Sequence, residues 1–108
     1  MEQSEKIKNL INENDVCLFM KGTPDSPQCG FSMAVTNVLK HLNVNFKGIN
    51  VLEDENLRKG IKEFSDWPTI PQLYIKKEFV GGCDIIKEMY ENGELKKIFE
   101  DKGISFKK

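Results

Sequence analysis

The sequence has few of the residues that build disulfide frameworks, metal sites or membrane spans. Its 108 residues include three cysteines and one histidine, and so small and odd a number of thiols argues against a network of paired disulfides. No apolar run approaches the roughly 20 residues of a membrane-spanning helix. The charged amino-terminal stretch has no apolar core of a secretory signal. We therefore expect a protein of a reducing, cytoplasmic interior, with no membrane as a partner.

The chain also lacks an excess of charge of either sign. It has 16 basic and 17 acidic residues, a net charge of −1, so we expect no nucleic-acid partner. Hydrophobic residues make up 39% and charged residues 31%, a composition typical of globular proteins. No repeat or linker divides the chain. We expect a single domain over residues 1–108, whose lysine-rich tail is frayed from about residue 103.

The spacing of apolar residues predicts five helices and four strands. Apolar positions at i, i+3 and i+4 indicate helices within residues 3–13, 29–42, 57–64, 85–90 and 95–99. Continuous or alternating apolar runs indicate strands within residues 15–21, 45–51, 72–75 and 78–80. Prolines mark residues 22–28 as a loop, and the last two strands form a hairpin that turns at Lys76 and Lys77.

This order of elements predicts an α/β fold with a four-stranded mixed β-sheet flanked by helices on both faces. The first two strands are joined through a helix, so they run parallel with a right-handed crossover, and the hairpin adds antiparallel strands. Ligands in such sheets bind outside the carboxyl ends of the parallel strands. Cys29 lies in the loop that leaves the first strand, which places it at that edge.

Cys29 is the candidate reactive group. A thiol reacts or binds metal as the thiolate, and an unperturbed thiol has a pKa of about 8.5. Cys29 precedes a strongly amphipathic run, so free N–H groups and the positive end of a helix dipole should lower its pKa. Lys21 can bring a cation to the same place, and Gly30 leaves the neighbouring backbone open. Ser32 stands where a second cysteine would complete C-x-x-C, so an outside thiol, or Cys83 if it lies close, must resolve a mixed disulfide. The alternative is a buried structural cysteine.

Three segments together resemble the monothiol, CGFS-type glutaredoxins. They read MKGTPDSPQCGFS at residues 20–32, WPTIPQLYI at 67–75 and VGGCDI at 80–85, and the likeness extends over about residues 4–100. The resemblance implies a thioredoxin-like fold. It also implies a cis peptide bond between Ile70 and Pro71, whereas general frequencies of X-Pro bonds favour trans.

The resemblance further implies a glutathione site. Lys21 and Arg58 would hold the glycyl carboxylate of glutathione, and the backbone of Ile70 would pair with its cysteinyl portion. Cys83 would offer its N–H to the γ-glutamyl carboxylate, and Asp84 would take the amino group. Two other cations of the same segment compete with Arg58 for its role, namely Lys59 and Lys62. Asp84 also suits a plain helix N-cap.

Two functions follow from the resemblance. The first is a carrier of a labile 2Fe-2S cluster that assembles the cluster and passes it to apoproteins. Such a cluster needs four ligands, which two copies of Cys29 and two glutathione molecules would supply, so the chain would be a homodimer with the cluster and a monomer without it. The second is a glutathione-dependent oxidoreductase that removes glutathione from protein thiols with Cys29 as nucleophile. The resemblance implies that CGFS members are weak in this enzymatic activity. A module with the fold but no chemistry is a third interpretation.

Other conspicuous residues have plainer interpretations. Cys17 lies in the middle of a predicted strand and is expected to be a buried small apolar residue. His41 has no partner at ligand spacing, so it does not indicate a zinc site. Phe31 and Trp67 suit either the core or the edge of the site. Lys77 stands in the hairpin turn, where glutaredoxins often have glycine, and this departure puts the turn type in question.

Overall fold

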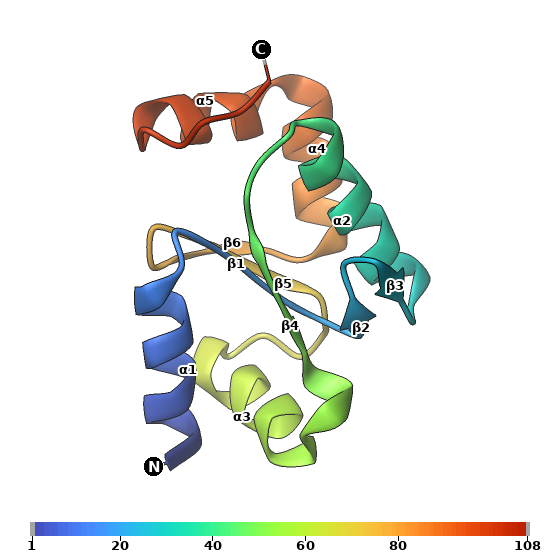
Figure 1. The fold of residues 1–108 in the computed structure, drawn as a ribbon, viewed down its shortest axis with the longest axis vertical. Helices are drawn as coiled ribbons and strands as arrows, with labels where there is room; N and C mark the ends of the chain where they lie inside the picture. The colour runs from blue at the N-terminus through green and yellow to red at the C-terminus, as the bar shows by residue number, and fades with distance from the viewer. Residues whose placement is uncertain (1, 108) are drawn as a thin grey trace.

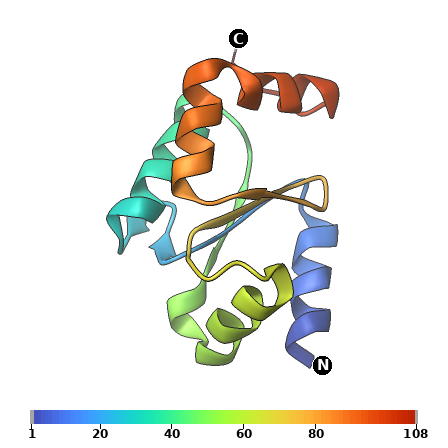
Figure 2. The ribbon, with the colours of Figure 1, turned by 180° about the vertical axis from the view of Figure 1, so that it is seen from behind.

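A computed structural model describes residues 2–107, which form a central sheet covered by helices on both faces (Figures 1 and 2). The helices are α1 (Glu2–Glu13), α2 (Gly30–His41), α3 (Glu55–Ser65), α4 (Cys83–Asn92) and α5 (Glu94–Asp101), with a 3₁₀ turn η1 (Val51–Glu53) before α3. The strands are β1 (Val16–Met20), β2 (Gly22–Thr23), β3 (Ser26–Pro27), β4 (Lys47–Asn50), β5 (Gln72–Ile75) and β6 (Glu78–Gly81). Helices α1 and α3 cover one face, while α2 and α4 cover the other and α5 packs against α4.

The main sheet has the strand order β4-β1-β5-β6. Strands β1 and β4 run parallel, with Phe19 opposite Ile49, because α2 carries the chain back across the sheet. Strand β5 is antiparallel to β1, and β6 is antiparallel to β5. The predicted mixed four-stranded sheet is therefore confirmed. Its two parallel strands end on the same side, next to the segment that carries Cys29.

Every residue of β1 is buried, as its continuous apolar run predicts for a strand covered on both faces. Successive side chains of a strand point to opposite faces. Cys17 and Phe19 accordingly pack in the core beneath α1 and α3, whereas Leu18 and Met20 pack in the core beneath α2 and α4. Burial raises the pKa of the Cys17 thiol to about 12. Cys17 is thus the buried small apolar residue that its position predicts.

The hairpin between β5 and β6 turns through two lysines in the left-handed region. The φ angles are 49° at Lys76 and 74° at Lys77, as a two-residue turn of the type that matches strand twist requires. Lys76 donates its backbone N–H to the carbonyl of Asp15 at 2.7 Å, and its Nζ lies 3.3 Å from the Asp15 carboxylate. These contacts stabilise the turn without a glycine.

The carboxyl-terminal segment differs from the expectation of a frayed tail. Ile104 and Phe106 pack against the core of α2, α4 and α5, and the ring centroids of Phe99 and Phe106 lie 6.0 Å apart. The backbone N–H of Lys107 donates to the carbonyl of Leu42 at 2.6 Å. The expectation followed the lysines of the segment, whereas Ile104 and Phe106 are partly buried against the core.

Two smaller differences concern segments near the parallel strands. Residues 22–28, expected as an open loop, contain the short antiparallel pair β2 and β3. The second predicted strand, residues 45–51, is shortened to Lys47–Asn50, because its pairing with β1 begins at Lys47 and η1 begins at Val51. Within residues 2–107, no helix has the length and apolar character needed to cross a bilayer.

Candidate functional site

Cys29 is the N-cap residue of α2, with extended φ and ψ of −150° and 136°, and it is partly exposed. The backbone N–H of Ser32 is the largest influence that lowers the pKa of the Cys29 thiol below its ordinary value. The Phe31 N–H, the Lys21 ammonium group and the Ser32 hydroxyl act in the same direction, while burial opposes them. Free N–H groups of a first helical turn stabilise an anion, so this position favours the thiolate, as expected.

Ser32 does more at the site than replace a second thiol. Its side chain is fully buried, and its hydroxyl accepts a hydrogen bond from the backbone N–H of Lys21 at 3.1 Å. The sequence by itself indicates only that a serine cannot form a disulfide. The structure adds that this hydroxyl connects the end of β1 with the first turn of α2, on either side of Cys29.

A groove of about 600 Å³ runs past the Cys29 sulfur. Its lining includes two lysines, the segment from Trp67 to Pro71 and the first residues of α4. Its lining consists of Lys21, Cys29, Phe31, Lys62, Trp67, Pro68, Thr69, Ile70, Pro71, Gly82, Cys83, Asp84 and Ile85. The groove is therefore lined by two cations, by one carboxylate and by the N-terminus of α4. Phe31, 62% exposed, borders the groove and is not part of the core.

Five of the six residues predicted for the site line this groove. They are Lys21, Cys29, Ile70, Cys83 and Asp84. The sixth, Arg58, is not among the lining residues, whereas its rival Lys62 is. The two share a face of α3, but Lys62 lies one turn closer to the groove wall, and its carbonyl accepts the backbone N–H of Trp67 at 3.2 Å.

The segment from Trp67 to Pro71, which forms one wall of the groove, is stabilised by hydrogen bonds from a residue that the sequence did not single out. Gln72 is fully buried, and its Nε2 donates to the carbonyls of Trp67 at 3.1 Å and Thr69 at 3.2 Å. The Ile70–Pro71 peptide bond is cis, as the resemblance implied. The one sequence signal that would have identified Gln72 is its position: it is a polar residue directly after a proline-rich segment and at the start of an otherwise apolar strand.

Space is short at position 82, where the Trp67–Pro71 segment approaches α4, so a larger residue would require its neighbours to shift by a few tenths of an ångström. A Cβ there would lie 3.2 Å from both the Pro71 carbonyl oxygen and the Trp67 Nε1, which is closer than ordinary van der Waals contact. Gly82 is also the N-cap residue of α4. Asp84 is therefore not the N-cap but a first-turn residue, and its exposed carboxylate lines the groove.

Cys83, the first residue of α4, is the second thiol of the groove. Burial raises the pKa of the Cys83 thiol, and the charges of Asp84 and Cys29 raise it further, while Lys87 opposes them. The two groove thiols thus differ in character. Cys29 is stabilised as a thiolate, whereas Cys83 favours its protonated form.

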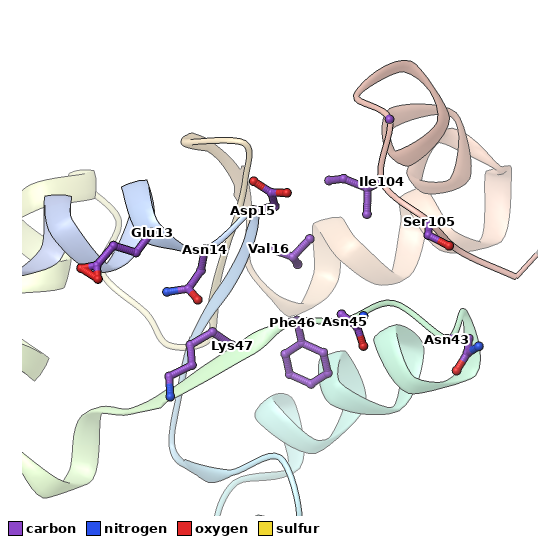
Figure 3. Close-up of a pocket in the computed structure, with 11 residues that line it drawn as sticks. Glu13, Asn14, Asp15, Val16, Asn43, Asn45, Phe46, Lys47, Ile104 and Ser105 are labelled. Carbon is purple, nitrogen blue, oxygen red and sulfur yellow. The ribbon is translucent and has the colours of Figure 1, made fainter.

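A second hollow, of about 670 Å³, lies at the opposite ends of β1 and β4 (Figure 3). Polar side chains such as Glu13, Asp15 and Lys47 line it, together with Ile104 of the carboxyl-terminal segment. None of its lining residues in the described chain is a cysteine. Within residues 2–107, no three His, Cys, Asp or Glu side chains gather as a metal site. The thiol chemistry of the molecule therefore belongs to the first groove.

Known proteins share both the sequence and the fold of this chain. The sequence profile of the glutaredoxin family matches residues 16–80. A probable monothiol glutaredoxin 2 of Rickettsia typhi is 59% identical over 95 residues, which cover 88% of this chain and 86% of that protein. The mitochondrial monothiol glutaredoxin-5 of Lachancea kluyveri is 56% identical over 103 residues, covering 93% and 72%. The solution structure of a monomeric truncated mutant of Trypanosoma brucei 1-C-Grx1 matches with a TM-score of 0.90 at 44% identity, covering 97% and 96%.

Proposed function

The chain belongs to the monothiol glutaredoxin family, and we propose that it binds glutathione in the groove beside Cys29 and carries a labile 2Fe-2S cluster to apoproteins. One observation carries the proposal. A partly exposed cysteine with a lowered pKa lines a groove that also presents two lysines, an aspartate and the N-terminus of a helix. That arrangement suits a tripeptide thiol laid beside a protein thiolate.

Each polar group of glutathione would have a chemically suited partner in the groove. A volume of about 600 Å³ lies in the range of small-molecule sites. The glycyl carboxylate would lie at Lys21 and Lys62, and the cysteinyl portion would pair with the backbone of Ile70. The γ-glutamyl carboxylate would accept the N–H of Cys83 at the positive end of α4, and its amino group would meet Asp84. The glutathione sulfur would then face Cys29.

On this proposal the cluster is a cargo that the protein delivers. The number of ligands that the cluster needs determines the oligomeric state of the loaded protein. A 2Fe-2S cluster needs four ligands, usually thiolates. Cys29 offers one, a second copy of the chain offers another, and two bound glutathione molecules supply the remaining two. The loaded protein is then a homodimer and the unloaded protein a monomer. Because half of the ligands are exchangeable small molecules, the cluster can pass to an acceptor with stronger thiolate ligands.

The second candidate function is removal of glutathione from protein thiols, which the lowered pKa of the partly exposed Cys29 thiol favours. The Cys29 thiolate would attack the glutathione sulfur of a mixed disulfide, and the target protein would leave as a thiolate. A second glutathione thiolate would then attack the Cys29–glutathione disulfide, which releases Cys29 and oxidised glutathione. Cys83 would replace that second glutathione only slowly, because its raised pKa leaves little thiolate.

Anaerobic reconstitution with iron, sulfide and glutathione tests the proposal. We expect a coloured dimer by visible spectroscopy and native mass spectrometry, with two glutathione molecules per dimer. Removal of glutathione should bleach it and return the monomer. Transfer is measured as loss of colour from this protein and gain of colour in an apo-ferredoxin after the two are separated.

The matched controls are Cys29→Ser and Cys17→Ala. The first should form no coloured dimer, while the second removes a buried thiol outside the groove and should retain the cluster. A coloured Cys29→Ser dimer would show that the ligand assignment is wrong. A colourless monomer that rapidly reduces glutathione mixed disulfides would replace cluster carriage with the oxidoreductase function.

A further inference from the structure

The segment before Cys29 is fastened to the end of β4 by one side chain outside the groove. The Oδ1 of Asn50 accepts the backbone N–H of Gly22 at 2.9 Å and that of Leu52 at 3.0 Å. Its Nδ2 donates to the Glu53 carboxylate at 3.4 Å. A single amide therefore joins β4 and η1 to the residue that directly follows Lys21.

Lys21 and Gly22 are held by three different parts of the fold. The Lys21 N–H donates to the Ser32 hydroxyl of α2, and the Lys21 carbonyl accepts the N–H of Gln28 at 2.9 Å. Asn50 holds the next N–H, that of Gly22. Gly22 has a φ of 89°, and a Cβ there would lie 2.5 Å from the Gln28 nitrogen, so the backbone is closely packed at this point. Lys21 is thereby oriented by contacts that its own side chain does not make.

We propose that Asn50 is a positioning residue for the thiol site, holding the Lys21–Gly22 peptide so that the Lys21 ammonium group faces the Cys29 sulfur. The consequence for Cys29 is independent of any ligand, whereas the consequence for the glutathione carboxylate rests on the function proposed above. Asn50 touches neither the reacting sulfur nor the groove, so it acts through Lys21.

The chemistry of an amide suits this position better than that of a carboxylate. A neutral oxygen can accept both N–H groups, and the amide N–H groups can donate to Glu53. An aspartate would keep the acceptor but face the Glu53 carboxylate with like charge, and it would add an anion on the Cys29 side of the sheet. Asn50→Asp therefore keeps the hydrogen bond to the Gly22 N–H and changes only the charge near Cys29 and Glu53.

The test uses the full chain without glutathione or iron. Hydrogen exchange of the Gly22 amide reports the bond to Asn50, and the rate at which iodoacetamide alkylates Cys29, located by peptide mass spectrometry, reports the thiolate. For Asn50→Ala we expect Gly22 exchange at least about tenfold faster and Cys29 alkylation at neutral pH about two- to fivefold slower. At a pH where the thiol is fully ionised the alkylation rates should converge, because Lys21 then no longer decides the thiolate fraction.

Asp54→Ala is the matched control. Asp54 also accepts two N–H groups, from Asn56 at 3.0 Å and Leu57 at 3.2 Å, but at the start of α3 and with no bond to residues 21–28. It should lower stability and leave Cys29 alkylation unchanged. Asn50→Asp should restore protection of Gly22.

Two results would overturn the positioning role. One is fast Gly22 exchange in Asn50→Ala with an unchanged Cys29 rate, and the other is an equal slowing of alkylation in Asp54→Ala. Failure of the cluster or glutathione experiments would leave these rates untouched, so the two proposals fail separately.

Discussion

Lys21 and Ser32 meet through a backbone N–H and a buried hydroxyl, 3.1 Å apart. The contact joins the residue after β1 to the first turn of α2, and Cys29 lies between them in the chain. Ser32 occupies the position of the second cysteine in a C-x-x-C motif, and its side chain has no exposed surface. At this position the serine hydroxyl therefore links the end of β1 to the first turn of α2, where a cysteine would instead offer a second thiol for exchange.

Replacing Ser32 by alanine should weaken both the site and the fold. The Lys21 N–H loses its acceptor, which costs about 1 kcal/mol in the free energy of unfolding, and the Cys29 thiolate loses one of its hydrogen bonds. We expect alkylation of Cys29 at neutral pH to slow about twofold. Urea unfolding and the rate of iodoacetamide alkylation measure the two effects. Ser105→Ala, an exposed serine of the carboxyl-terminal segment, should change neither, and an unaltered Ser32→Ala protein would contradict the prediction.

The buried Cys17 thiol should make the protein less stable in alkali. Its folded pKa of about 12 lies above the ordinary value of 9.0, so its contribution is complete at low pH and is lost as pH rises beyond the ordinary value. Between about pH 8 and about pH 10 the free energy of unfolding should fall by about 1 kcal/mol from this group alone. The measurement is the urea midpoint at both pH values, compared between the unchanged protein and Cys17→Ala.

Cys17→Ala should remove the part of the fall in the free energy of unfolding at alkaline pH that comes from this thiol. This holds whatever the effect of the substitution on stability at neutral pH. Tyr74, whose pKa is raised to about 12 mainly by burial and in smaller part by Cys17, stays in both proteins and accounts for most of the alkaline loss that remains in Cys17→Ala. An identical pH dependence in the two proteins would contradict the assignment to Cys17.

Gly48 and Gly30 should respond in opposite ways to substitution by alanine. A Cβ on Gly48 would lie 2.5 Å from the Pro24 Cγ, so Gly48→Ala must push the β2–β3 hairpin away and should cost about 1–3 kcal/mol. A Cβ on Gly30 meets nothing within 4 Å. Gly30 is the first residue of α2, and alanine there should stabilise the fold by up to about 1 kcal/mol. Thermal or urea unfolding of both variants checks the pair, and a Gly48→Ala protein as stable as the unchanged one would show that the hairpin moves freely.

Lys62 rather than Arg58 should govern the affinity for glutathione. Lys62 lines the groove and Arg58 does not, and a charge-assisted hydrogen bond to a carboxylate contributes about 1.5 kcal/mol or more. We expect Lys62→Ala to raise the glutathione concentration needed for half-maximal cluster formation about tenfold, and Arg58→Ala to change it less than about twofold. The titration is read by visible absorbance. A larger effect of Arg58→Ala than of Lys62→Ala would show that Arg58 binds the glycyl carboxylate of glutathione.

Much of the site could be predicted because its residues lie at ends of elements that the sequence marks clearly. Cys29 precedes a strong helical pattern, and Cys83 and Asp84 follow paired glycines, so both helix starts that line the groove could be assigned. The choice between Arg58 and Lys62 could not be made, because both lie on one face of α3 and only the packing of that helix decides which turn reaches the groove.

The sequence by itself determined the order of the elements, the mixed sheet, the helix start at Cys29 and the burial of Cys17, since each follows from local periodicity, from turn residues or from the position of one residue within a run. The tertiary structure alone decided the contacts between distant segments: Asn50 on Gly22, Lys76 on Asp15, and Lys107 on Leu42. Polar groups of the backbone and side chains take such roles only when a partner far along the chain arrives beside them. No local pattern specifies that partner, because the crossover and the hairpin must first bring the strands together.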